Sequence, residues 1–120
     1  MTVAAERGFS VAKPWGDSQR YDFVVAQENG KFVRVQVKST MARFGRMGYL
    51  CSFTATGRAP YTREQVDFFA IYIIPEDVWY IVPIDVIVRL KVNILLAPRR
   101  VGQKYERFKE AWELLGGGPE

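Results

Sequence analysis

The 120-residue chain contains no histidine and a single cysteine, Cys51. Without histidine, Ser-His-Asp and Cys-His catalysis, Cys2His2 zinc sites and imidazole acid–base chemistry are all excluded. One cysteine cannot form a disulfide within the chain, and its place in the apolar run at residues 49–53 predicts a buried thiol. Any catalysis must therefore use carboxylate, amide, lysine, arginine or tyrosine side chains.

Long apolar runs are also missing. The two longest, at residues 68–75 and 78–84, are separated by Glu76 and Asp77. Neither reaches the roughly 18 apolar residues of a membrane-spanning helix. The N-terminus lacks the basic flank and apolar core of a signal peptide. We therefore expect a cytoplasmic protein, associated with the nucleoid if it binds DNA.

What the chain does contain is typical of a globular domain. Apolar residues make up 48% of the sequence and charged residues 25%, and 120 residues suit one hydrophobic core. We find no internal repeat and no low-complexity linker. We expect a single domain over residues 1–115, followed by a flexible, glycine-rich tail at residues 116–120.

The excess of positive over negative charge is confined to one segment of the chain. The net charge is +4, yet no acidic residue occurs between Glu28 and Glu64. The basic residues of this window are Lys31, Arg34, Lys38, Arg43, Arg46, Arg58 and Arg63. Basic side chains interleaved with aromatic ones are typical of a surface that faces phosphate groups. A solvent-exposed edge strand protected by its charges is the alternative.

Hydrophobic periodicity indicates an α/β (α+β) domain with a mixed sheet. Strands or extended segments are predicted at residues 9–12, 21–26, 31–38, 46–54, 68–74, 78–82 and 92–96. Helical segments are predicted at residues 3–7, 61–66, 84–89 and 104–115. In the last of these, Phe108 and Trp112 have helical spacing and are expected in the core. Asp67, just before a buried strand, is expected to make a structural hydrogen bond.

The strand at residues 31–38 alternates with a period of two, which places Gln36 and Lys38 on the same face. Asp22 joins them only in one of two hairpin registers. A two-residue turn would place Asp22 opposite Val37, on the other face. A three-residue loop with a left-handed Gly30 places Asp22 opposite Gln36. We predict the second register, which brings the three polar side chains together.

Asp22 followed by Gln36-Val37-Lys38 resembles the PD-(D/E)xK nuclease superfamily. The resemblance includes the preceding loop at residues 14–21 and continues through residues 61–72 and 79–84. The most similar branch is a small group of endonucleases related to group I intron homing endonucleases, with Holliday junction resolvases as more distant relatives. The resemblance implies a restriction-endonuclease-like core, in which helices flank a mixed β-sheet.

The same resemblance implies Mg²⁺-dependent hydrolysis of DNA phosphodiester bonds, with Mn²⁺ as a substitute, and Asp22, Gln36 and Lys38 as catalytic residues. Asp22, the Gln36 side-chain oxygen and the Val37 carbonyl would be the metal ligands, and a hard cation does prefer oxygen. Lys38 would orient the attacking water and offset charge in the transition state. Because one small domain offers one site and two strands must be cut, a homodimer or homotetramer is expected.

Six residues are expected to contact the DNA: Ser18, Arg20, Ser39, Thr40, Arg43 and Arg46. For Ser39 and Thr40, capping of a turn is the alternative to a phosphate contact. For Arg43 and Arg46, the alternative is a solvated loop. Arg99 and Arg100 would either extend the basic surface or lie near a contact between subunits.

Two departures from the family pattern bear on activity. Gln36 occupies a position that usually holds Asp or Glu, and Glu6 lies too late to replace the glutamate of the family's first helix. Three explanations stay open: the true start lies upstream, Asp17 substitutes, or the protein binds nucleic acid without cutting it. An oligomeric interaction module built on the aromatic strands at residues 68–80 is a further alternative.

Overall fold

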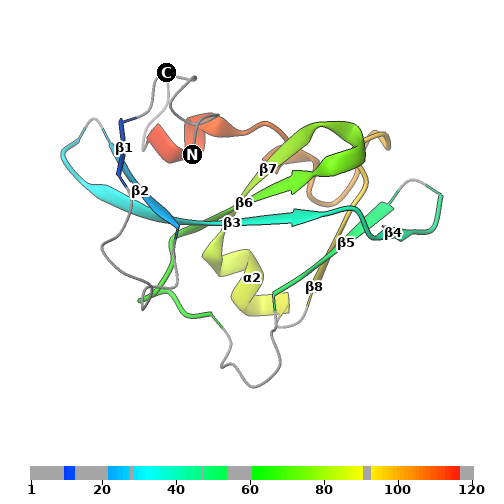
Figure 1. Ribbon diagram of the computed structural model, residues 1–120, viewed down its shortest axis with the longest axis horizontal. Helices are drawn as coiled ribbons and strands as arrows, with labels where there is room; N and C mark the ends of the chain where they lie inside the picture. The colour runs from blue at the N-terminus through cyan, green and yellow to red at the C-terminus, as the bar shows by residue number, and fades with distance from the viewer. Residues whose placement is uncertain are drawn as a thin grey trace.

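The computed structural model describes residues 10–12, 22–27, 29–46, 48–53, 61–90 and 93–116 (Figure 1). The elements in chain order are β1 (Ser10–Ala12), β2 (Phe23–Ala26), β3 (Phe32–Thr40), β4 (Arg43–Phe44), β5 (Gly48–Ser52), β6 (Phe68–Ile73), η1 (Ile74–Glu76), β7 (Val78–Pro83), α2 (Ile84–Leu90), β8 (Asn93–Leu96), η2 (Glu106–Phe108) and η3 (Trp112–Gly116). The expected helix at residues 3–7 lies outside the described residues. No described helix is long and apolar enough to cross a membrane.

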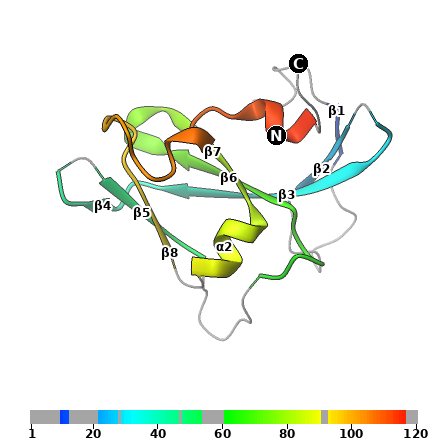
Figure 2. The same ribbon diagram turned by 180° about the vertical axis from the view of Figure 1, so that it is seen from behind.

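The strands of the described residues form two sheets. The larger has the strand order β1-β2-β3-β6-β7, and the smaller has the order β4-β5-β8. β3 pairs with β6 in parallel and with β2 antiparallel, so the larger sheet is mixed, as the sequence predicts. α2 and the smaller sheet lie on one side of β3, and η3 lies on the other (Figures 1 and 2).

Each face of the larger sheet packs against its own core. One core joins β6 and β7 to β5, α2 and β8, and includes Phe69, Ile87 and Leu96. The other joins β2 and β3 to the C-terminal turns, through Phe23 and Trp112. The larger sheet therefore lies between two apolar layers.

The loop between β2 and β3 has the predicted length of three residues. Gln27 donates its amide to the Lys31 carbonyl at 2.7 Å, and Ala26 pairs with Phe32. Gly30 has a φ of +84°, the left-handed conformation that this loop requires and that glycine adopts without steric cost. The register prediction for the hairpin is therefore confirmed.

The prediction of a short helix at residues 61–66 is wrong. The segment makes a single turn in which the amides of Gln65 and Val66 both bond to the Thr62 carbonyl. The next carbonyls along the chain, of Arg63 and Glu64, accept hydrogen bonds from the Arg34 guanidinium instead. A side chain from β3 thus takes the acceptors that a continuing helix would use.

The prediction of a continuous helix at residues 104–115 is also wrong. Two short 3-10 segments, η2 and η3, replace it, although Phe108 and Trp112 are buried as expected. Glu110, between the two, has a φ of +51° and exchanges two hydrogen bonds with Trp79 of β7. Pairing with β7 thus outweighs the helical periodicity of the segment.

The other predicted elements that fall within the described residues are found with shifts of at most two residues at their ends. The basic segment before β5, expected as a loop, forms the short strand β4. Cys51 is buried in β5, as its apolar neighbours predict.

Candidate active site

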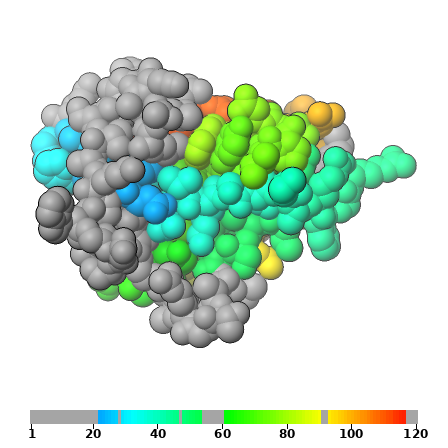
Figure 3. Space-filling view, in the orientation of Figure 1, coloured from blue at the N-terminus to red at the C-terminus, as the bar shows by residue number. Residues whose placement is uncertain are grey.

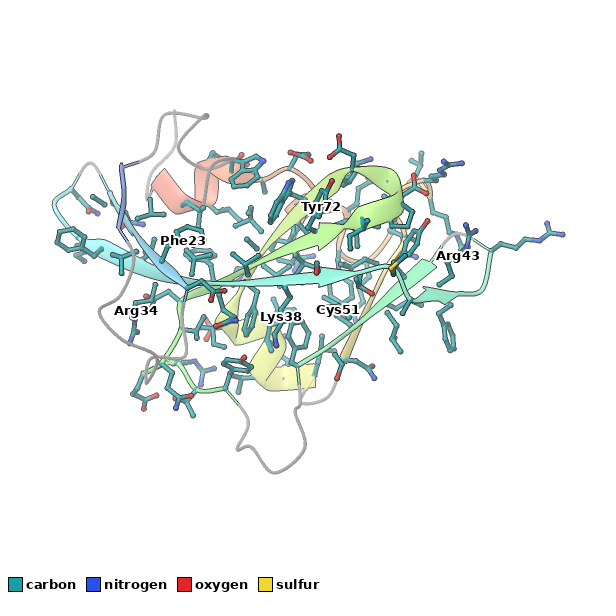
Figure 4. All side chains as sticks on the ribbon, in the orientation of Figure 1. Phe23, Arg34, Lys38, Arg43, Cys51 and Tyr72 are labelled. Atoms are coloured by element: carbon teal, nitrogen blue, oxygen red, sulfur yellow. The ribbon has the colours of Figure 1, made fainter. Side chains whose placement is uncertain are left out.

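β3 carries two of the predicted site residues on one face. Gln36 and Lys38 alternate with Val35 and Val37, which belong to the opposite core. In Figure 4, Lys38 and Arg34 lie on the side of β3 that faces the smaller sheet, while Phe23 lies on the other side. Gln36 and Lys38 are both half-buried, so their polar ends lie at the margin of the apolar layer.

Asp22 lies just before β2 and is fixed to β3 by two hydrogen bonds. Its amide donates to the Val35 carbonyl at 2.8 Å, and its carboxylate Oδ2 accepts the Val37 amide at 2.7 Å. Because Phe23 pairs with Val35, the same register places Asp22 opposite Gln36. The structure therefore brings Asp22 to the strand segment that holds Gln36.

Lys38 is placed by aromatic packing. Its Nζ lies 5.4 Å from the centroid of the Tyr61 ring, which is a cation–π distance. The buried Cys51 lies within electrostatic reach on the same side: burial raises the pKa of its thiol to about 11, and the positive charge of Lys38 opposes this rise. The ammonium is therefore held between β3, β5 and the turn that contains Tyr61.

This strand segment offers three oxygen donors of the kind that a hard divalent cation prefers. They comprise the Asp22 carboxylate, the Gln36 amide oxygen and the Val37 carbonyl, which accepts a 3.3 Å hydrogen bond from Gln36 Nε2. A carbonyl has two lone pairs, so this bond leaves one for a further partner. Among the described residues, no three His, Cys, Asp or Glu side chains form a metal-binding group. Asp22 is thus the one carboxylate of this donor set.

Two of the predicted DNA contacts follow directly on the site. Ser39 is exposed, whereas Thr40 has only 8% of its surface exposed. The Thr40 hydroxyl donates to the Leu50 carbonyl at 2.6 Å and accepts the Ala42 amide at 3.1 Å. Thr40 therefore caps the end of β3, the alternative to a phosphate contact.

The other predicted DNA contacts fall into two groups. Arg43 of β4 and Arg46 in the following turn are exposed, and Figure 4 shows Arg43 far from Phe23, the first residue of β2. Ser18 and Arg20 lie outside the described residues, as do Asp17 and Glu6. The DNA contacts of Ser18, Arg20, Arg43 and Arg46 stay predictions.

Arg34 is a residue of the site region whose role the sequence did not reveal. It lies on the Gln36 face of β3 and forms an ion pair with Asp67, at 3.0 Å from Nε to Oδ2. The Asp67 carboxylate also accepts the Arg34 amide at 2.8 Å, which confirms the structural hydrogen bond expected for Asp67. Through these bonds β3 holds the turn that places Tyr61 over Lys38. The only signal in the sequence was the place of Arg34, two residues before Gln36.

Comparisons with known proteins agree with this geometry. A family model described as PD-(D/E)XK endonuclease matches residues 1–115. The solved structure of a bacterial homing endonuclease, I-Ssp6803I, is 28% identical in sequence, with a TM-score of 0.80 over 97% of this chain and 84% of that one. Comparison with curated proteins gives no match. With nearly the whole sequence matched to the family model, the chain belongs to the PD-(D/E)XK endonuclease family and has its restriction-endonuclease-like fold.

Proposed function

We propose that the protein is a metal-dependent DNA endonuclease that uses Asp22, Gln36 and Lys38. The observation that carries this proposal is the register of the β2–β3 hairpin, which places Asp22 opposite Gln36 with Lys38 next on the same face. Family membership supports phosphodiester hydrolysis. The proposed roles need no histidine, and the chain contains none.

Asp22, the Gln36 amide oxygen and the Val37 carbonyl are the residues that would hold Mg²⁺, or Mn²⁺ in its place. Proteins often bind Mg²⁺ through one or two carboxylates, and water and substrate phosphate fill the other positions. A single carboxylate therefore suffices in principle. When bound, the cation would polarise the scissile phosphate and neutralise part of its charge.

The side chains contribute orientation and charge. The Val37 amide fixes Oδ2 of Asp22, so the carboxylate keeps one orientation relative to β3. Lys38 Nζ donates hydrogen bonds to the attacking water and to a phosphate oxygen, whose negative charge grows as the water oxygen bonds to phosphorus. The Tyr61 ring and the margin of the apolar layer limit the positions of this ammonium before DNA binds.

DNA is the proposed partner because the chain segment that begins with the site strand β3 carries positive charge and no negative charge. The described part of the chain from Arg34 to Phe53 contains four basic residues and no acidic one. Cutting both strands with one site per chain requires two copies, so we infer a homodimer or a homotetramer.

Nicking of supercoiled plasmid in Mg²⁺ tests the proposal. Asp22→Ala and Lys38→Ala should each lower the rate at least about a hundredfold, the scale of a lost acid–base or electrostatic group, and chelation of the metal should abolish cleavage. Lys31→Gln, which removes an exposed charge at the other end of the strand, is the control and should cleave normally. Cleavage that survives both site substitutions would refute the assignment.

A catalytically inactive nucleic-acid-binding protein on the same fold is the second candidate. The single carboxylate of the described donor set favours it. Salt-dependent DNA binding without cleavage by the wild-type protein would identify this function. Absence of both binding and cleavage would instead favour an oligomeric interaction module.

A further inference from the structure

The β4–β5 hairpin projects from one end of the molecule. We call residues 43–46 and 48 the arm: Arg43 pairs with Tyr49 and Phe44 pairs with Gly48, so the arm is a two-stranded ribbon. In Figure 3 the arm extends beyond the packed body at the right-hand edge. A Cβ on Gly48 would lie 2.8 Å from the Phe44 carbonyl, so glycine is what allows the two strands to approach this closely.

The arm is rigidly attached at its base. Tyr49, 1% exposed, donates its hydroxyl to the Glu76 carboxylate at 2.9 Å, and Arg99 binds the other oxygen of Glu76 at 2.8 Å. Arg43 stacks 5.7 Å from the centroid of the Tyr49 ring and donates to the Arg46 carbonyl at 2.7 Å. These contacts fix the direction of the arm before any partner binds, which lowers the entropy cost of binding.

The outer surface of the arm combines an aromatic side chain with positive charge. Phe44 is 60% exposed, and Arg46 beside it is exposed with no ion-pair partner among the described residues. A groove of about 500 Å³ separates the arm from the turn at residues 97–103. Its described lining includes Leu95, Arg100 and Gln103 and contains no acidic residue.

The geometry points to the arm as a base-reading element that enters the major groove of duplex DNA. A two-stranded β-ribbon fits the major groove, where an aromatic side chain contacts the methyl group of thymine and arginine binds the edge of guanine. Phe44 and Arg46 would reach the base edges, and Arg100, across the groove, would contact a backbone phosphate. This inference rests on the proposed function, because it takes DNA as the substrate.

A second copy of the chain is a less suitable occupant. In a two-fold symmetric interface the same patch meets itself, so the arginines of one arm would face those of the other. The arm itself carries Arg43 and Arg46, Arg99 and Arg100 lie near it, and the nearby Glu76 already binds Arg99. A polyanion matches this charge, whereas an identical cationic surface does not.

Binding to duplex DNA without divalent metal tests the arm separately from catalysis. Phe44→Ala should weaken binding about tenfold and alter the sequences selected from a randomised duplex pool. Phe32→Ala is the matched control, since Phe32 is 68% exposed at the opposite end of β3. Arg46→Gln gives a second, independent loss of base preference, and both variants should keep the wild-type circular dichroism spectrum.

Two further measurements separate base contacts from phosphate contacts. Replacing thymine by uracil in a selected duplex removes the methyl group; wild type should lose affinity and Phe44→Ala should not. Arg100→Gln should reduce the slope of log K against log salt by about one and leave the selected sequence unchanged.

The outcomes distinguish this inference from the proposed function. One outcome is cleavage that depends on Lys38 while Phe44→Ala and Arg46→Gln keep wild-type binding and sequence selection. This result would refute the inference about the arm and leave the proposed function intact. DNA binding that depends on the arm, without any cleavage, would refute the proposed endonuclease function and leave the inference about the arm intact. If Phe44→Ala changes the mass of the oligomer in solution but not DNA binding, the arm contacts a second copy of the chain, and the inference is also refuted.

Discussion

The ammonium of Lys38 lies 5.4 Å from the centroid of the Tyr61 ring, and Tyr61 in turn packs edge-on against Phe69 at 4.9 Å. Tyr61 is 8% exposed and Phe69 is fully buried. The ring is therefore fixed by the core beneath the sheet, and it limits where the lysine can lie. Core packing and the candidate site share this one residue.

Tyr61→Leu should lower the cleavage rate about tenfold at saturating DNA, on the scale of a lost cation–π contact near a partly desolvated charge. Tyr61→Phe keeps the aromatic face and should retain most of the activity. Single-turnover rates, measured with DNA affinity for each variant, check this. Equal rates for Tyr61→Leu and wild type would show that the ring does not position the lysine.

Arg34→Met should lower the free energy of unfolding by about 2 kcal/mol, because it leaves the half-buried Asp67 carboxylate without its charged hydrogen-bond donor. Urea denaturation gives the value. Lys31→Met, at an exposed position near the start of the same strand, is the control and should change stability by less than about 0.5 kcal/mol. Similar effects of both variants would contradict the importance of the ion pair.

Stability should depend on pH through Glu76. Hydrogen bonds from Arg99 and Tyr49 lower the pKa of this carboxyl from 4.5. A carboxyl whose pKa is lower in the folded protein stabilises the fold above the unfolded value, and this stabilisation is lost as the pH falls through the folded value. Glu76→Gln should therefore be less stable than wild type near pH 7, and the difference should shrink below about pH 4.5. Thermal unfolding midpoints between pH 3 and 7 follow both proteins; a constant difference would refute the linkage.

The thiol of Cys51 should react slowly with disulfide reagents in the native protein. It is 3% exposed, and burial raises its pKa to about 11, so little thiolate is present at pH 8. Denaturant should restore the reactivity of an ordinary cysteine. Rapid labelling without denaturant would show that β5 opens readily, contrary to the packing described here.

Much of the site could be predicted because its geometry is local. The period of two in the strand places Gln36 and Lys38 on one face, and the length of the loop at Gly30 sets the position of Asp22. Both depend on residues close in the sequence, where strand and turn chemistry leave few choices. The catalytic roles of these residues are not visible in the backbone and stay predictions.

The surroundings of the site could not be predicted because they depend on distant partners. Arg34 holds a turn about thirty residues later in the chain, and it is this contact that brings Tyr61 to Lys38. Glu110 likewise interrupts a helical pattern by bonding to Trp79. Local hydrophobic periodicity shows only which face of each segment is buried, so it reveals neither of these contacts.

The parallel pairing of β3 with β6 has a consequence for synthesis of the protein. The ribosome makes all three proposed site residues before it makes Phe68, which pairs with Val35. Until that later strand is translated, the strand bearing Gln36 and Lys38 lacks its inner neighbour and the Arg34 anchor lacks Asp67. Pairing between such distant segments also forms slowly. We therefore expect the nascent chain to stay inactive toward DNA until its second half has been translated.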